Sequence, residues 1–157
     1  MSVNKSTNKK RIFWTCFSVV WVLFIFLQSL LPAKASSAES GKIVEFLNLI
    51  CRSIGFDFSF SSHFVRKSAH FFEFAVLGFA LHSALIRYEP KTLITCIFTP
   101  LLYIAVAVSD ECFQLISSGR ACSFSDMLLD ICGATFGFVL AIIFCFLKSK
   151  GIFKRGA

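Results

Sequence analysis

The chain has few charged residues: they make up 16% of its 157 residues, whereas 56% are hydrophobic and the mean hydropathy is +0.74. This composition excludes a soluble globular domain of this size. The seven cysteines include no CxxC pair, and the sequence has no zinc signature, nucleotide-binding loop, Ser-His-Asp order or haem motif. Cofactor chemistry of those kinds is therefore unsupported, and the sequence identifies neither a cofactor nor a metal.

The chain does contain four apolar stretches close to the roughly 20 residues that a helix needs to cross a bilayer. They predict transmembrane helices at about residues 12–31, 66–86, 92–116 and 126–147. Residues 41–55 show hydrophobic residues at helical spacing but are too short and too charged to span. The predicted fold class is an all-α membrane protein, a bundle of four transmembrane helices plus a short interfacial amphipathic helix between spans 1 and 2.

The basic residues predict how this bundle is oriented. We expect a single transmembrane domain at 12–147, with a cytoplasmic tail at 1–11 and a basic cytoplasmic tail at 148–157. Ten of the sixteen Lys and Arg residues lie on the side of these tails, so the positive-inside rule places both termini in the cytoplasm. The charge thus sets topology rather than binding nucleic acid, and the lipid bilayer is the expected partner.

An alternative reading of the N-terminus is a cleavable secretory signal that ends near Ala33-Lys34-Ala35. Its unbroken apolar run of about 20 residues exceeds the usual 7–15 of a signal core, which favours a retained first span.

Packing features follow from small residues and proline. We expect a small-residue loop at residues 32–41 and a kink or loosened hydrogen bond at Pro100 in the third span. Gly133 and Gly137 form a GxxxG pattern that permits close helix approach in the fourth span. The scattered cysteines are expected to be buried small hydrophobes, with one bridge such as Cys112–Cys122 as the alternative.

Polar and ionisable residues interrupt the apolar stretches. A charge at the centre of a membrane helix costs about 2.5–3.5 kcal/mol on insertion scales, so such residues are functional candidates by default. The candidates, which the topology brings to one level of the membrane, are Lys67, His70, Glu73, Asp110, Glu111, Gln114, Arg120, Asp126 and Asp130.

Helical phase aims these side chains inward. At about 100° per residue, Lys67, His70 and Glu73 share an arc of roughly 120°. Asp126 and Asp130 share a face with the two glycines, which predicts that they point into the bundle. A convergent polar pocket that opens on the outer side is the expected result.

The chain resembles the VanZ family of small bacterial membrane proteins in its polar motifs, which are Arg66-Lys67-x-x-His70-Phe71-x-Glu73, Ser109-Asp110-Glu111-x-x-Gln114, Gly119-Arg120 and Ser125-Asp126. The resemblance covers most of the chain and implies a multi-pass protein of the bacterial cell membrane. It also implies an association with low-level resistance to the glycopeptide teicoplanin, which is a process and not a reaction. Relatives usually carry Asn at the position of Asp130, so this chain adds an acid to the site.

Two classes of function fit these residues. The first is a membrane enzyme or a binding protein that acts on a lipid or cell-wall precursor headgroup at the outer leaflet. Its catalytic candidates are His70, Glu73, Asp110 and Glu111, and its substrate-binding candidates are Lys67, Gln114, Arg120, Asp126 and Asp130. Some of the acids could instead ligate a divalent ion. The second class is a non-catalytic envelope or partner-binding factor whose polar cluster is structural, and the question of enzymatic activity stays open between the two.

Several candidates also have purely structural explanations. Arg66 and Lys67 suit snorkelling at the interface, and His70 with Glu73 suits a structural hydrogen-bonded pair. Ser123-x-x-Asp126 matches a capping box. Asp130, one turn deeper, has no such explanation.

Overall fold

The computed structural model describes residues 2–55, 59–89, 92–119 and 122–150, and these residues form five helices. The helices are α1 (Ser2–Ser29), α2 (Ala33–Ser53), α3 (Ser62–Leu85), α4 (Thr92–Ile116) and α5 (Phe124–Ser149). Four of them contain segments long and apolar enough to cross a membrane, namely Asn8–Ser29, Ser62–Leu85, Leu93–Ile116 and Phe124–Ser149. The predicted fold class, four membrane-spanning helices plus one further helix between the first two, is confirmed.

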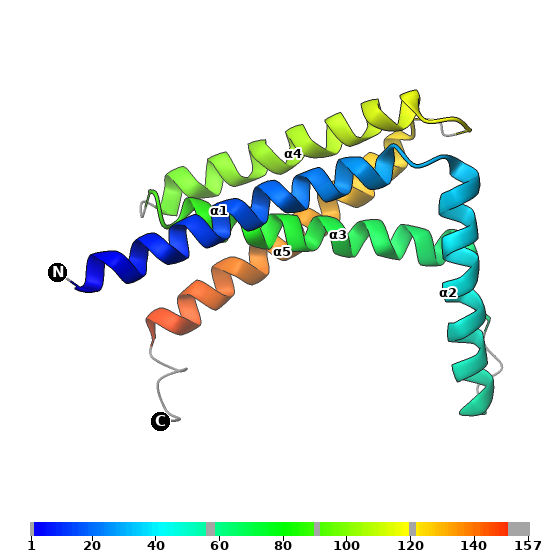
Figure 1. Ribbon diagram of the computed structural model, residues 1–157. Coiled ribbons are helices and arrows are strands. Elements are labelled where there is room, and N and C mark those ends of the chain that lie inside the picture. The colour runs from blue at the N-terminus through cyan, green and yellow to red at the C-terminus, as the bar shows by residue number, and fades with distance from the viewer. Residues whose placement is uncertain (1, 56–58, 90–91, 120–121, 151–157) are drawn as a thin grey trace.

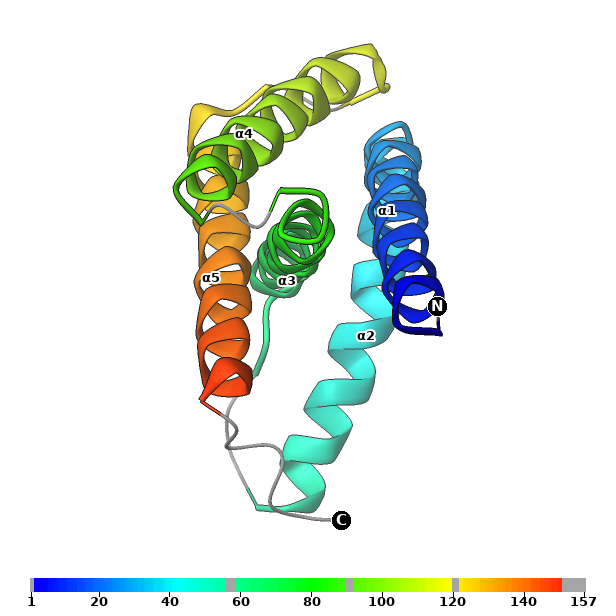
Figure 2. The same ribbon diagram turned by 90° about the vertical axis from the view of Figure 1, so that its left-hand side faces the viewer.

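The four long helices run side by side, and α2 lies crosswise at one end of them (Figure 1). Figure 2 shows α3 in the middle, with α1, α4 and α5 around it. α3 contacts each of the other four helices, whereas α2 contacts α3 alone among them. α1 begins and α5 ends at the same end of the bundle (Figure 1). The last turns of α1 and α4 and the first turns of α3 and α5 lie together at the opposite end, which we call the polar end.

The central position of α3 explains where the core lies. Phe74 and Leu77 of α3 are completely buried, and the core cluster adds Ile25, Tyr103, Ala107 and Ala134 from α1, α4 and α5. Partly buried Trp21 of α1 packs against this cluster and donates its indole N–H to the Glu73 carbonyl oxygen at 2.9 Å. α3 therefore has both the lowest mean hydropathy of the four spanning segments and the largest buried share.

Glycines allow α3 and α5 to approach closely. A Cβ atom added to Gly133 or Gly137 of α5 would collide with the carbonyl oxygen of Phe71 or Ala75, respectively. Gly78 of α3 faces the backbone of α5 in the same way. The GxxxG face therefore packs against α3 as expected, and it turns Asp130 inward on the same side.

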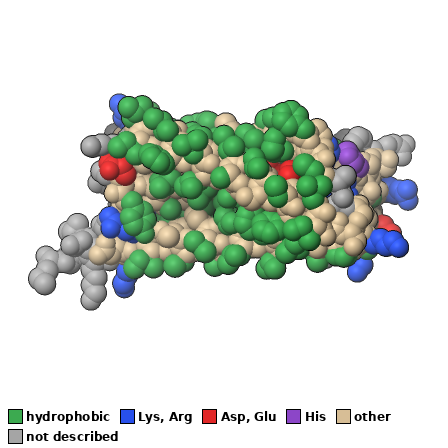
Figure 3. Space-filling model, turned by 90° about the horizontal axis from the view of Figure 1, so that it is seen from above, with side chains coloured by type: hydrophobic (Ala, Val, Ile, Leu, Met, Phe, Trp, Pro, Cys, Tyr) green, Lys and Arg blue, Asp and Glu red, His purple; other side chains and the backbone are tan. Residues whose placement is uncertain are grey.

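The outer surface suits a lipid environment. Hydrophobic side chains cover the middle of the face seen in Figure 3, and Lys and Arg side chains lie towards its two ends. At the end where α1 begins, the Arg11 guanidinium donates to the Arg87 carbonyl oxygen at 2.9 Å and lies over the Tyr88 ring. Long basic side chains that fold onto aromatic rings are typical of a membrane–water boundary.

Two local expectations were wrong. The segment at 32–41 is not a loop, because α2 begins at Ala33 directly after Pro32 and runs for 21 residues. Proline suits the start of a helix, where its missing N–H is not needed, and the Ala residues that follow are good helix formers. The cysteines are not buried: all seven are free, and each is exposed or half-buried. Around Pro100, α4 remains one continuous helix.

Candidate functional site

Asp110 connects two helices, α1 and α4, at the polar end of the bundle. Its side chain is fully buried, and both carboxylate oxygens accept hydrogen bonds. Ser29, the last residue of α1, donates its hydroxyl to Oδ1, and Gln114, one turn further along α4, donates Nε2 to Oδ2 at 2.9 Å. Buried carboxylates need such donors because an unsatisfied one is costly. Asp110 thereby ties α1 to α4.

Glu111, the next residue, ties α4 to the start of α5. It is 2% exposed, and its Oε2 accepts the backbone N–H of Ser123 at 2.8 Å. In a capping box the side chain of Asp126 would accept that N–H. The expected capping box is therefore absent, because a carboxylate from α4 takes its place. Glu111 also hydrogen-bonds to the Cys122 thiol, and this bond raises the pKa of the thiol.

Lys67 and Asp126 form an ion pair between α3 and α5. Lys67 Nζ lies 2.8 Å from Asp126 Oδ1, and both side chains are about one-third exposed, at 33% and 36%. Because the pair is open to solvent, its net contribution to stability is small, on the order of 0–1 kcal/mol. Its main effect is to fix the two side chains at the mouth of the pocket.

A deeper group consists of His70, Glu73 and Asp130. His70 Nδ1 lies 3.9 Å from Glu73 Oε2 one turn away, and both side chains are mostly buried. Asp130 is 1% exposed, and its Oδ1 has no hydrogen-bond partner among the described residues. One ligand atom from each of His70, Asp110 and Asp130 lies within 4.8 Å of the other two, so this trio has the composition and spacing of a possible cation site.

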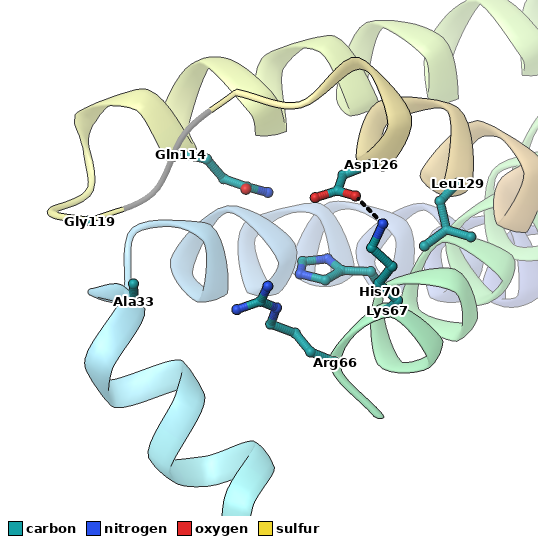
Figure 4. Close-up of a pocket in the computed structure, with 8 residues that line it drawn as sticks. All are labelled: Ala33, Arg66, Lys67, His70, Gln114, Gly119, Asp126 and Leu129. Atoms are coloured by element: carbon teal, nitrogen blue, oxygen red, sulfur yellow. Dashed lines mark ion pairs between the residues drawn. The ribbon is translucent and has the colours of Figure 1, made fainter. Parts of the chain in front are cut away.

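A cavity of about 130 Å³ lies at this end of the bundle, and it is lined by four of the candidates, Lys67, His70, Gln114 and Asp126. Its lining residues are Ala33, Arg66, Lys67, His70, Gln114, Gly119, Asp126 and Leu129. Figure 4 shows the side chains of Arg66, Lys67 and His70 from α3 directed into the same space as Gln114 of α4 and Asp126 of α5. A second cavity of about 170 Å³ shares Arg66 and His70 with the first and extends between α2 and α3.

The structure thus brings together eight of the nine site candidates, whereas Arg120 lies outside the described residues. It also adds groups whose roles the sequence did not reveal. Ser29 and Ser123 supply donors to the two buried acids, and Ser36 and Ser40 of α2 line the second cavity. Two of these serines carried a signal in the sequence: Ser29 is polar at the end of an apolar span, and Ser123 belongs to the capping-box pattern. The positions of the others depend on how α2 and the α4–α5 connection fold back.

The connection before α2 closes one wall of the pocket. The Ala33 N–H donates to the Ser118 carbonyl oxygen at 3.2 Å, and the Ser117 hydroxyl donates to the Leu31 carbonyl oxygen at 2.9 Å. Gly119 has φ +78°, a conformation that other residues rarely adopt, and this lets the α4–α5 connection turn beside Ala33.

Four long apolar helices, with a polar pocket at one end of the bundle, define a small multi-pass membrane protein. The chain matches the VanZ/LLP1 family over residues 14–145, and it belongs to that family. The match includes every candidate site residue. Searches of curated proteins and of solved structures gave no match.

Proposed function

We propose that the pocket faces the outside of the bacterial cell membrane and binds an anionic lipid or cell-wall precursor headgroup, through which the protein contributes to resistance to teicoplanin-type glycopeptides. The observation that carries this proposal is the position of Arg66. Its guanidinium points into the cavity, and none of the described residues forms an ion pair with it (Figure 4). A guanidinium open to a pocket is suited to bidentate binding of phosphate or carboxylate groups.

The surroundings of Arg66 support an anionic ligand of limited size. Arg66 and Lys67 are adjacent in the second turn of α3 and bring two basic side chains to the lining of the cavity. Gln114 and His70 add hydrogen-bonding side chains to the lining of the same cavity. We assign ligand binding to Arg66, Lys67, Gln114 and Asp126, with Arg120 as a further candidate from the sequence.

A catalytic role is best assigned to His70 with Glu73. His70 lines both cavities and has a carboxylate one turn away, which is the arrangement of an oriented acid/base group. Asp110 and Glu111, predicted as catalytic, are less suited to proton transfer with a ligand. Neither lines the cavity, and both hold other parts of the chain through hydrogen bonds.

The hydrogen bonds of Asp110 and Glu111 to other parts of the chain favour a second candidate function. This is a non-catalytic envelope factor whose acidic residues hold the bundle together. The two functions make different demands on Arg66 and His70. A structural cluster needs Asp110 and Glu111 but not a free guanidinium, whereas a headgroup site needs Arg66.

The experiment compares teicoplanin susceptibility of cells that express Arg66→Gln or His70→Ala with cells that express wild-type protein. Matched controls are Arg52→Gln on the exposed face of α2 and His63→Ala in the exposed first turn of α3, since neither side chain lines the first cavity. We expect the site variants to lose most of the resistance at unchanged membrane abundance, and the controls to keep it. Resistance that survives Arg66→Gln, or that falls only in proportion to abundance, would favour the structural factor.

A further inference from the structure

Three carboxylates lie almost without solvent contact beneath the pocket, and none of them forms an ion pair with a described Lys or Arg residue. Asp110, Glu111 and Asp130 are 0%, 2% and 1% exposed. The described salt bridges of this region, Lys67 with Asp126 and His70 with Glu73, involve none of the three. Removing a carboxylate from water without a paired charge costs several kcal/mol, so proton uptake or a bound cation would stabilise these acids.

The hydrogen bonds distinguish the three acids. Both oxygens of Asp110 accept a hydrogen bond, but each retains a lone pair that a metal can use. Asp130 Oδ1 is buried and has no hydrogen-bond partner among the described residues. One carboxylate oxygen of Asp130 lies within 4.8 Å of a ligand atom of Asp110 and of one of His70. An acceptor directed into a polar cluster without a donor indicates that a group is missing from its surroundings.

We infer that His70, Asp110 and Asp130 form a binding site for one divalent first-row ion, Zn²⁺ or Mn²⁺. Their ligand atoms all lie within 4.8 Å of one another. Two ligands of one ion, each about 2.0–2.2 Å from it, are at most about 4.4 Å apart, so small side-chain rotations bring the three into range. One imidazole with two carboxylates favours Zn²⁺ or Mn²⁺ over Mg²⁺ and Ca²⁺, which prefer oxygen ligands alone.

The structure also provides orientation and access for the ion. Ser29 and Gln114 hold the Asp110 carboxylate through their hydrogen bonds, as groups around a metal ligand commonly do. His70 lines the open cavity, so an ion can reach the site from the pocket. This inference rests on the buried acids and does not depend on headgroup binding, although the ion would add positive charge at the pocket floor.

The test measures metal binding by the purified full chain in nanodiscs of zwitterionic lipid. After chelation and removal of the chelator, Zn²⁺ and Mn²⁺ are titrated separately, and bound metal per chain is measured against empty nanodiscs. We expect one ion per chain for wild type and an affinity at least about tenfold weaker for Asp130→Asn and His70→Ala. His63→Ala and Glu45→Gln, which remove an exposed histidine and an exposed acid, should bind as wild type does.

The number of ions bound by the wild-type protein tests whether the site exists, even if a variant fails to fold. Substoichiometric binding of both ions by folded wild type would overturn the inference, as would unchanged affinity in folded Asp130→Asn. A further readout is thermal: each ion should raise the melting temperature of wild type but not that of Asp130→Asn. Arg66→Gln should still bind the ion, so loss of resistance in that variant and loss of metal in Asp130→Asn separate the two proposals.

Discussion

At the scale of single residues, two buried serines of α1 have different partners and should contribute differently to stability. Ser29 donates its hydroxyl to the Asp110 carboxylate of α4, whereas the Ser18 hydroxyl donates to the Trp14 carbonyl oxygen of its own helix. Ser29→Ala leaves a buried carboxylate oxygen without its donor, which should lower the free energy of unfolding by about 1–3 kcal/mol.

Ser18→Ala is the matched control, because it removes a hydroxyl that is equally buried but bonds to a neutral acceptor within one helix. We expect a change within about 0.5 kcal/mol for this variant. Equilibrium unfolding in detergent micelles measures both. Equal effects of the two substitutions would mean that Asp110 does not depend on Ser29.

At the scale of helices, the α3–α5 interface depends on the absence of side-chain atoms. Gly137→Ala places a methyl group against the Ala75 carbonyl oxygen, which belongs to backbone and cannot rotate away. Overpacking of this kind costs about 1–3 kcal/mol or more, so we expect a lower melting temperature and reduced membrane abundance. The same direction is expected for Gly133→Ala, which meets the Phe71 carbonyl oxygen.

Gly41→Ala provides the control within the same chain. Gly41 is also helical, but a Cβ added there meets nothing within 4 Å. Alanine should therefore stabilise α2 by about 0.5–1 kcal/mol through its higher helix propensity. If Gly137→Ala and Gly41→Ala change the melting temperature alike, close packing of α3 on α5 does not hold the bundle together.

The helices also show which features of the fold could be predicted from the sequence and which could not. Apolar length predicted the four spans, and the glycine spacing predicted the face that turns Asp130 inward. Both are local properties of one helix. The helical form of residues 33–40 was missed because serine and alanine fit loops and helices alike. The bond from Ser123 to Glu111 was missed because it depends on where the α4–α5 connection lies against α4, which no local pattern encodes.

At the scale of the whole molecule, the polar pocket is lined by residues near the start of α3 and α5 and near the end of α4. These segments lie at the opposite end of the bundle from the start of α1 and the end of α5 (Figure 1). Helical phase predicts that the candidate residues lie at one level of the membrane. Only the packed bundle shows that Asp110 and Glu111 hydrogen-bond to residues outside α4, and that Arg66 lines the cavity without an ion pair to any described residue. The side of the membrane on which this pocket opens determines whether it meets extracellular glycopeptide targets. Orientation is therefore the property on which the proposed function most depends.

Cys122 offers an internal probe of that orientation, because it is exposed in the α4–α5 connection at the pocket end. In a variant whose other six cysteines are replaced, we expect a membrane-impermeant maleimide to label Cys122 in intact cells. A cysteine introduced as Ser149→Cys at the opposite end should react only after permeabilisation, and the reverse pattern would place the pocket in the cytoplasm.

The rate at which Cys122 reacts with maleimide should depend on pH. Since the hydrogen bond to Glu111 raises the pKa of the Cys122 thiol, less thiolate is present at neutral pH, and labelling should accelerate as the pH rises. Glu111→Gln removes the charged acceptor, so that variant should label faster than its parent at pH about 7.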